Sequence, residues 1–227
     1  MARLARVVVP GIPHHVTQRG NGRARTFFSD DDYRLYCSLL ADHCQNADVG
    51  IWAWVLMPNH VHLILTPADS DGIRRALSKV HRQYAGALNA RRKRTGHFWQ
   101  GRFGCVAMDE TYLLAAVRYV VMNPVRSRLA KRAVDWRWSS VHAHVGRERE
   151  FQITDTAAMA ERIPDFAAFI RAGEDEELSK AVRRAESIGR PLGDGAFLDK
   201  LETRTGRRLK ARKRGPEPKR KKSALSP

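Results

Sequence analysis

Residues 51–65 constrain the fold most, because they contain two β-forming runs separated by a tight turn. Ile51–Met57 is rich in aromatic and aliphatic residues, which favour a strand. Pro58-Asn59 predicts a tight turn, and His60–Leu65 predicts the returning strand. The segment is therefore expected to form a β-hairpin.

Two histidines lie at the start of the second strand of this hairpin. Successive side chains of a strand point to opposite faces, so His60 and His62 share one face, with Cβ atoms roughly 6–7 Å apart. The other face carries the aliphatic side chains of Val61, Leu63 and Leu65, which predict the core. Two imidazoles at this spacing suit a divalent metal ion, although two half-buried histidines without a ligand would give the same pattern.

The remaining predicted elements place strands and amphipathic helices around this hairpin. We expect a strand over 12–19, helices over 30–46 and 73–92, a strand over 104–108, a helix over 111–123, a helical segment over 150–186 and a short helix over 197–209. Organisation along the chain suggests a compact domain over 1–146, a small helical extension over 147–188 and a basic tail over 189–227.

The charge of the chain favours a nucleic-acid partner. The chain has 227 residues, of which 41 are Lys or Arg and 24 are Asp or Glu, giving a formal net charge of +17. Neutralisation of phosphates drives the affinity of such proteins for nucleic acids. Eleven Lys or Arg lie between Arg204 and Lys222, and Arg212 and Arg214 are candidate DNA contacts. An inert solubilising tail is the alternative.

Further candidate DNA contacts combine arginines with aromatic rings. Arg19, Arg23 and Arg25 surround the predicted turn at residues 20–22, and Arg82 belongs to the basic outer face of the helix over 73–92. Trp99, Gln100 and Arg102 form a mixed aromatic and basic segment typical of stacking platforms for single strands. Trp99 alternatively seals the edge of the sheet.

The helix over 111–123 carries a second pair of polar residues. Tyr119 and Asn123 are four residues apart and therefore lie on one helix face. The proline at 124 disfavours helical backbone at Asn123, so we expect the helix to end there. A core tyrosine and a helix-terminating asparagine would explain the pair without a function.

Taken together, four motifs resemble the single-tyrosine HUH transposases, and in particular the REP-associated tyrosine transposases related to the insertion-sequence-200 class. The motifs lie at 58–62 (PNHVH), 98–103 (FWQGRF), 119–126 (YVVMNPVR) and 138–140 (WSS). The opening segment 13–21 (PHHVTQRGN) also resembles that group, and the likeness covers roughly residues 5–145.

This resemblance implies an α+β fold: the ferredoxin-like palm of HUH endonucleases, with a central antiparallel sheet and packed helices. It implies His60 and His62 as metal ligands, Tyr119 as the nucleophile and Asn123 as a third ligand or water-holder. Insertion-sequence relatives usually carry glutamine at the last of these positions. Arg126 follows in the same motif and is a further candidate DNA contact. The implied cofactor is Mg²⁺ or Mn²⁺, and the implied partner is single-stranded DNA beside a hairpin.

The implied activity is cleavage and rejoining of single-stranded DNA through a covalent 5′-phosphotyrosine. A phenol with a pKa near 10 is a poor nucleophile unless the site activates it. The alternatives are a non-catalytic DNA or RNA hairpin-binding protein on the same scaffold, and a nickase of the replication-initiator or relaxase type.

The cellular setting expected from the sequence is a bacterial cytoplasm, in association with the nucleoid. Three cysteines without a C-x-x-C pair predict no disulfide framework. No signal peptide or 18-residue apolar run is visible, so no membrane partner is expected. The sequence leaves both a monomer and a homodimer open.

Overall fold

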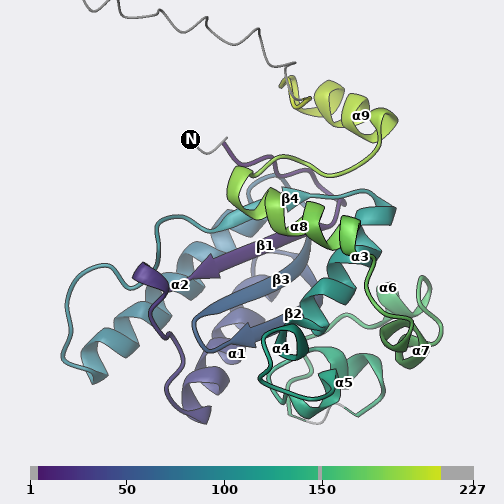
Figure 1. Ribbon diagram of the computed structural model, residues 1–227. Helices are drawn as coiled ribbons and strands as arrows, with labels where there is room; N and C mark the ends of the chain where they lie inside the picture. The colour runs from purple at the N-terminus through teal and green to yellow at the C-terminus, as the bar shows by residue number, and fades with distance from the viewer. Residues whose placement is uncertain (1–4, 148–149, 211–227) are drawn as a thin grey trace, which may run out of the picture.

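The computed structural model describes residues 5–147 and 150–210, and its centre is a four-stranded sheet (Figure 1). The strands are β1 (His14–Arg19), β2 (Val49–Met57), β3 (His60–Pro67) and β4 (Gly104–Ala107). Their order is β2-β3-β1-β4, and every neighbouring pair is antiparallel. With α1 (Asp30–Gln45) and α2 (Gly72–Arg91), the chain order is βαββαβ, the ferredoxin-like arrangement. The predicted α+β fold is confirmed.

The hairpin of β2 and β3 forms as expected. Met57 pairs with His60 across the turn, and Val55 pairs with His62. Alternation along β3 then divides its side chains between two hydrophobic clusters, because Val61, Leu63 and Leu65 belong to one and Ile64 to the other. His62 consequently points to the face opposite the main core.

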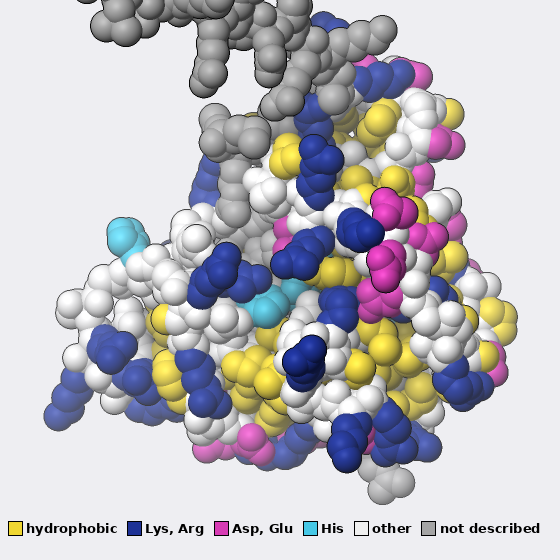
Figure 2. Space-filling model, viewed as in Figure 1, with side chains coloured by type: hydrophobic (Ala, Val, Ile, Leu, Met, Phe, Trp, Pro, Cys, Tyr) yellow, Lys and Arg dark blue, Asp and Glu magenta, His cyan; other side chains and the backbone are white. Residues whose placement is uncertain are grey.

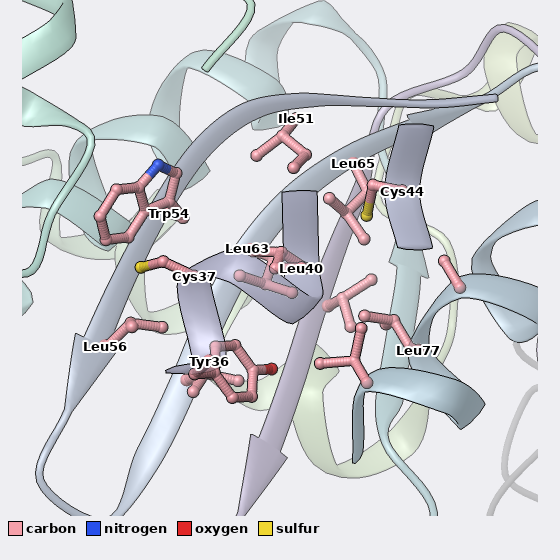
Figure 3. Packing of buried hydrophobic residues seen from close by; sticks show 14 of the residues in the cluster. Tyr36, Cys37, Leu40, Cys44, Ile51, Trp54, Leu56, Leu63, Leu65 and Leu77 are labelled. Carbon is pink, nitrogen blue, oxygen red and sulfur yellow. The ribbon is translucent and has the colours of Figure 1, made fainter. Parts of the chain in front are cut away.

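Helices α1 and α2 cover the main core face of the sheet. Helix α1 begins at a capping box, in which Ser29 and Asp32 satisfy each other's backbone N–H groups. Figure 3 shows Tyr36 and Leu40 of α1 packed over Leu63, with Leu77 of α2 beside them. This apolar layer fixes the position of β3 and thereby the direction of its histidines.

The opposite face is covered by helices from the second half of the chain. Helix α3 (Glu110–Val121) and helix α8 (Glu176–Ile188) pack on each other and on the sheet (Figure 1). Asp109 caps α3 by accepting a hydrogen bond from Tyr112 N, and Asp175 caps α8 in the same way. The shorter elements are η1 (Asn21–Arg23), α4 (Asn123–Arg126), η2 (Ala133–Asp135), α5 (Val141–His144), α6 (Ala157–Ala160) and α7 (Phe166–Arg171).

The expectation for the end of the third helix was wrong. Helix α3 ends at Val121, and Asn123 begins the separate four-residue helix α4. Pro124 lies in the first turn of α4, where its fixed φ and missing N–H are tolerated. The proline therefore starts a new helical turn instead of only ending the old one.

Helix α9 (Gly195–Thr205) packs against the N-terminal segment of the chain. Leu201 and Leu209 form a small cluster with Val7, Val9 and Ala107. The helix ends earlier than the predicted 209, because Gly206 adopts a left-handed φ of 63°. Among the described residues, no helix is long and apolar enough to cross a membrane.

Candidate active site

The histidines of β1 and β3 meet on the sheet face that α3 and α8 cover. His15 pairs with Ile64, Thr17 with His62, and Arg19 with His60. Since side chains alternate along a strand, His15 and Arg19 of β1 share this face with His60 and His62 of β3. The sheet thus brings three imidazoles and one guanidinium to one place.

His62 and His15 are the most enclosed of these groups. Each is 1% exposed, and Nδ1 of His62 shares a hydrogen bond of 3.0 Å with Nε2 of His15. Oε1 of Glu186, on α8, lies 3.8 Å from the same Nδ1. The other ring nitrogen, Nε2, is buried and has no hydrogen-bond partner among residues 5–147 and 150–210. His62 therefore carries a buried nitrogen available to a ligand.

His60 lies at the opening of the site, at the first residue of β3. Its ring meets that of His62 edge-on, with centroids 4.9 Å apart. Its Nδ1 shares a hydrogen bond of 2.6 Å with Oδ1 of Asn59, which orients the imidazole. The predicted histidine pair is thus brought together with its rings held by neighbouring side chains.

Tyr119 projects from α3 against both inner histidines. Its ring centroid lies 5.6 Å from that of His62 and 6.0 Å from that of His15, and both contacts are edge-on. The guanidinium of Arg126 lies 3.9 Å above the tyrosine ring, and its Nη2 donates to the backbone oxygen of Tyr119. The carboxylate of Glu186 lies close enough to affect the pKa of the hydroxyl. The ring is consequently held between the two histidines and Arg126.

A cavity of about 760 Å³ opens in front of these residues. Its lining includes His60, His62, Tyr119 and Asn123, the four residues predicted for catalysis and metal binding. Asn123 is 5% exposed, and its Oδ1 accepts a hydrogen bond of 3.3 Å from Ser127. Its amide oxygen is therefore already engaged in the structure.

Burial sets the protonation state of the histidines. It lowers the pKa of His15 and of His60 to about 3 each, and it lowers the pKa of His62 well below its ordinary value. Nearby positive charge, including that of Arg126, acts in the same direction. The three imidazoles are neutral at pH 7, the form that ligates a metal ion.

Burial has the opposite consequence for the acidic groups. It raises the pKa of the Tyr119 hydroxyl, and Glu186 adds to this effect while Arg126 opposes it. Burial also raises the pKa of Glu186 to about 7. The phenol is protonated in the free protein, so it must lose its proton during any attack.

A divalent ion fits the donor atoms of this site. The ligand atoms of His15, His62 and Glu186 all lie within 4.8 Å of one another, and Oε1 of Glu186 is buried without a hydrogen-bond donor among the described residues. Two nitrogens and a carboxylate oxygen suit Mn²⁺, whereas Mg²⁺ prefers oxygen alone. The predicted set of His60, His62 and Asn123 shares His62 with this cluster.

Four of the predicted DNA contacts lie around the site. Arg19 and Arg126 line the large cavity, and Gln100 and Arg102 line an adjoining cavity of about 190 Å³ together with Arg19. In Figure 2, Lys and Arg side chains lie around the histidines on this face of the molecule. The surroundings of the site therefore favour an anionic ligand.

Other predicted contacts lie elsewhere. Arg23 at the end of η1 and Arg25 in the loop before α1 are both exposed, and Arg25 Nε donates to the Phe27 carbonyl. Arg82 is exposed on α2, which covers the sheet face opposite the histidines. Arg212 and Arg214 lie outside the described residues.

Trp99 packs partly into the protein, at the edge of the main core. Its indole Nε1 donates to the His81 carbonyl at 2.9 Å, and its ring stacks on Tyr84. The side chain is half-buried and belongs to the periphery of the main core. This favours the alternative in which the indole seals the sheet.

Sequence reasoning missed three residues of the site. Alternation along the predicted strand over 12–19 puts His15 on the same face as Arg19, so the sequence did contain a signal for His15. Glu186 and Arg183 come from α8, far from the motifs in sequence, and nothing in the pattern links them to Tyr119. Their position follows from the packing of α8 on α3.

Comparison with known proteins now decides the family. The family model described as "Transposase IS200 like" matches residues 9–123, which include His15, His60, His62, Tyr119 and Asn123. The chain belongs to the IS200-like transposase family. This is a family of HUH-type transposases that act on single-stranded DNA.

Two members illustrate the relationship of this IS200-like protein to characterised chains. It is 31% identical over 97 residues to the REP-associated tyrosine transposase of Escherichia coli K12, a stretch covering 42% of this chain and 56% of that one. It also resembles a solved REP-associated tyrosine transposase bound to a REP hairpin, with a TM-score of 0.56 and 24% identity. That match covers 69% of this chain and 93% of the solved one, and it shows the shared fold.

Proposed function

We propose that this IS200-like protein is a metal-dependent single-strand DNA endonuclease and strand transferase whose nucleophile is Tyr119. One observation carries the proposal: the Tyr119 ring lies against His62, and both line the same cavity of about 760 Å³ with His60. Four Lys or Arg and two Glu also line this cavity, so positive charge exceeds negative charge in its walls. A phosphate bound in that cavity would lie beside the Tyr119 hydroxyl and beside the imidazoles of His60 and His62.

The reaction follows from the groups present. The phenolic oxygen of Tyr119 attacks phosphorus, the bond from phosphorus to the 3′ oxygen breaks, and the phenol loses its proton. The products are a 5′-phosphotyrosine and a strand ending in a 3′-OH, which takes up a proton. Because the phosphodiester energy is retained, another 3′-OH can reverse the step and join two strands.

The proposed metal ligands are His60 and His62, with Asn123 as a third ligand or water-holder. Glu186 and His15 are the alternative partners of His62, since their donor atoms already converge. When bound, Mg²⁺ or Mn²⁺ would polarise the scissile phosphate and stabilise the charge that develops on it. The cationic side chains of Arg19, Arg126 and Arg183 line the cavity and would hold the strand on either side.

The proposed substrate is single-stranded DNA beside a hairpin, such as a repetitive extragenic palindrome. A flexible strand can place one phosphate between a sheet and a helix more readily than a rigid duplex can. The likeness to a protein solved with a REP hairpin supports this choice.

Covalent capture tests the proposal. Labelled oligonucleotides with a hairpin and a single-stranded flank are incubated with the protein and Mn²⁺ or Mg²⁺, and then denatured. We expect an adduct that requires metal and disappears in Tyr119→Phe, while binding is retained because only the hydroxyl is lost. Binding without an adduct on a panel of hairpins would instead favour the non-catalytic hairpin binder.

A further inference from the structure

A series of adjoining cavities leads away from the active site along the edge strand β4. The cavity of about 190 Å³ beside His62 shares Arg102 and Glu186 with a small hollow of about 20 Å³. That hollow shares Arg6 and Phe103 with a third cavity of about 630 Å³. Each cavity of this series therefore shares lining residues with the next, from the histidines to the third cavity.

The third cavity lies where α9 packs on the N-terminal segment, and we call it the α9 cavity. Its lining includes the four arginines Arg6, Arg74, Arg204 and Arg207 and a single acidic residue, Asp71. Asp71 is already paired with Arg74, at 2.5 Å. Positive charge consequently exceeds negative charge in its walls.

Two of these arginines are fixed by backbone groups. Arg204 Nη2 donates to the carbonyl of Pro10, and Arg207 donates to the carbonyls of Ala5 and Arg6. Neither forms an ion pair with a carboxylate of the described residues. Their charges are thus oriented without being neutralised, which is the state expected of a phosphate-binding arginine.

The lining of the α9 cavity extends from Phe103, next to the β4 residue Gly104 that pairs with Thr17, to Pro10, which precedes β1. Arg102 lies between the active site and this cavity, since it lines both the site-side cavity and the small hollow. In Figure 2, Lys and Arg side chains lie between the central histidines and α9.

We propose that the α9 cavity binds backbone phosphates of the single-stranded flank of the DNA substrate, and that the flank runs along β4 past Arg102 to reach it. The proposal deepens the proposed function, because it assumes that single-stranded DNA is the substrate. Glu186 is the one acidic residue that lines the cavity of about 190 Å³, and its Oε1 lies 3.8 Å from Nδ1 of His62, on the side of the catalytic site.

A length series on the unmodified protein tests the path. Hairpin oligonucleotides carry a single-stranded flank that is extended one nucleotide at a time, on the 5′ side or on the 3′ side. Affinity is measured without divalent metal, over a range of salt concentrations. We expect the affinity and its salt dependence to increase on one of the two sides and to level off once the flank reaches the α9 cavity.

Paired substitutions locate the effect. Arg204→Gln with Arg207→Gln should lower the slope of log K against log salt by about 1.4 on the long-flank substrate, since each phosphate contact on a single strand contributes about 0.7. The same variant should bind the short-flank substrate like the unmodified protein. Arg204→Lys with Arg207→Lys should keep the slope, because the charges remain.

The matched control, Lys131→Gln with Arg171→Gln, removes two positive charges elsewhere. It should change neither the affinity for the short-flank and long-flank substrates nor its salt dependence. The proposal is overturned if affinity is independent of flank length on both sides, or if the glutamine pair leaves the slope unchanged. Should the glutamine pair fail to fold, the length series still decides. Formation of the covalent adduct is measured separately on the short-flank substrate, which does not reach the α9 cavity. This measurement distinguishes a failure of the α9 cavity proposal from a failure of the proposed reaction at Tyr119.

Discussion

His15 and His62 share a buried hydrogen bond between Nε2 of the first imidazole and Nδ1 of the second, at 3.0 Å. When His62 donates in this bond, its Nε2 carries a lone pair, which is the tautomer that a metal ion requires. His15 then acts as the acceptor that selects this tautomer. The same kind of partner orients most metal-binding histidines.

Replacing His15 should therefore weaken metal binding. We expect His15→Phe to lower the affinity for Mn²⁺ by about 10- to 100-fold, because the tautomer of His62 is no longer selected. His15→Gln can still accept a hydrogen bond, so its affinity for Mn²⁺ should decrease less. Isothermal titration measures the affinity, with His97→Gln as the exposed control. Equal affinities in all variants would rule out the orienting role.

Glu186 should matter although it lies outside the region matched by the family. Glu186→Gln removes the charge beside His62 and Tyr119, and we expect adduct formation to slow by about 10-fold or more. Glu177→Gln, on the exposed side of the same helix, is the control. If both variants react at the same rate, α8 is only a cover for the site.

The fold was predictable because local signals agreed with each other. The Pro58-Asn59 turn and the alternation from His60 to Leu65 specified the hairpin and its two faces. The predicted start of the helix over 30–46 was correct, because Ser29 caps α1 directly before Asp30. Each of these signals depends only on neighbours in the sequence.

The site was predictable only in part, for a physical reason. Tyr119 reaches the histidines because α3 packs on the sheet. The four-residue spacing predicted that Tyr119 and Asn123 share a helix face, but it did not predict what that face contacts. Glu186 is added by α8, and the position of that helix depends on long-range packing that no short pattern encodes. The contacts of Trp99 with Tyr84 and His81 could not be predicted for the same reason, since both partners come from α2.

The protein should become less stable as the pH is lowered, because several histidines are buried in neutral form. Burial lowers the pKa of His81 to about 3 and of His14 to about 4, against 6.5 in the unfolded chain. Below pH 6.5 the unfolded state binds more protons, so the free energy of unfolding decreases as pH falls. Urea unfolding at pH 7.5, 6 and 5 measures the slope.

The contribution of a single histidine can be isolated at His81, whose Nε2 is hydrogen-bonded to the Tyr36 hydroxyl at 3.0 Å. His81→Gln should reduce the pH slope by up to about 1.4 kcal/mol per pH unit, because one titrating group is lost. An unchanged slope in this variant would show that His81 is not held neutral by burial.

The core beneath β3 should be sensitive to truncation. Leu63 is fully buried between α1 and the sheet, so Leu63→Ala should lower the free energy of unfolding by about 2–5 kcal/mol. Leu129 is 46% exposed, and Leu129→Ala should change the free energy of unfolding by about 0.5 kcal/mol or less. Chemical denaturation of both variants makes the comparison, and similar losses would contradict the packing described for β3.

The most direct test of the central claim is to identify the residue that carries the DNA. The protein is trapped on a hairpin oligonucleotide in the presence of Mn²⁺, digested with nuclease and protease, and examined by mass spectrometry. The account predicts a nucleotide phosphate on the peptide that contains Tyr119, and its presence in Tyr112→Phe but not in Tyr119→Phe. A nucleotide on any other residue would contradict the assignment of Tyr119 as the nucleophile.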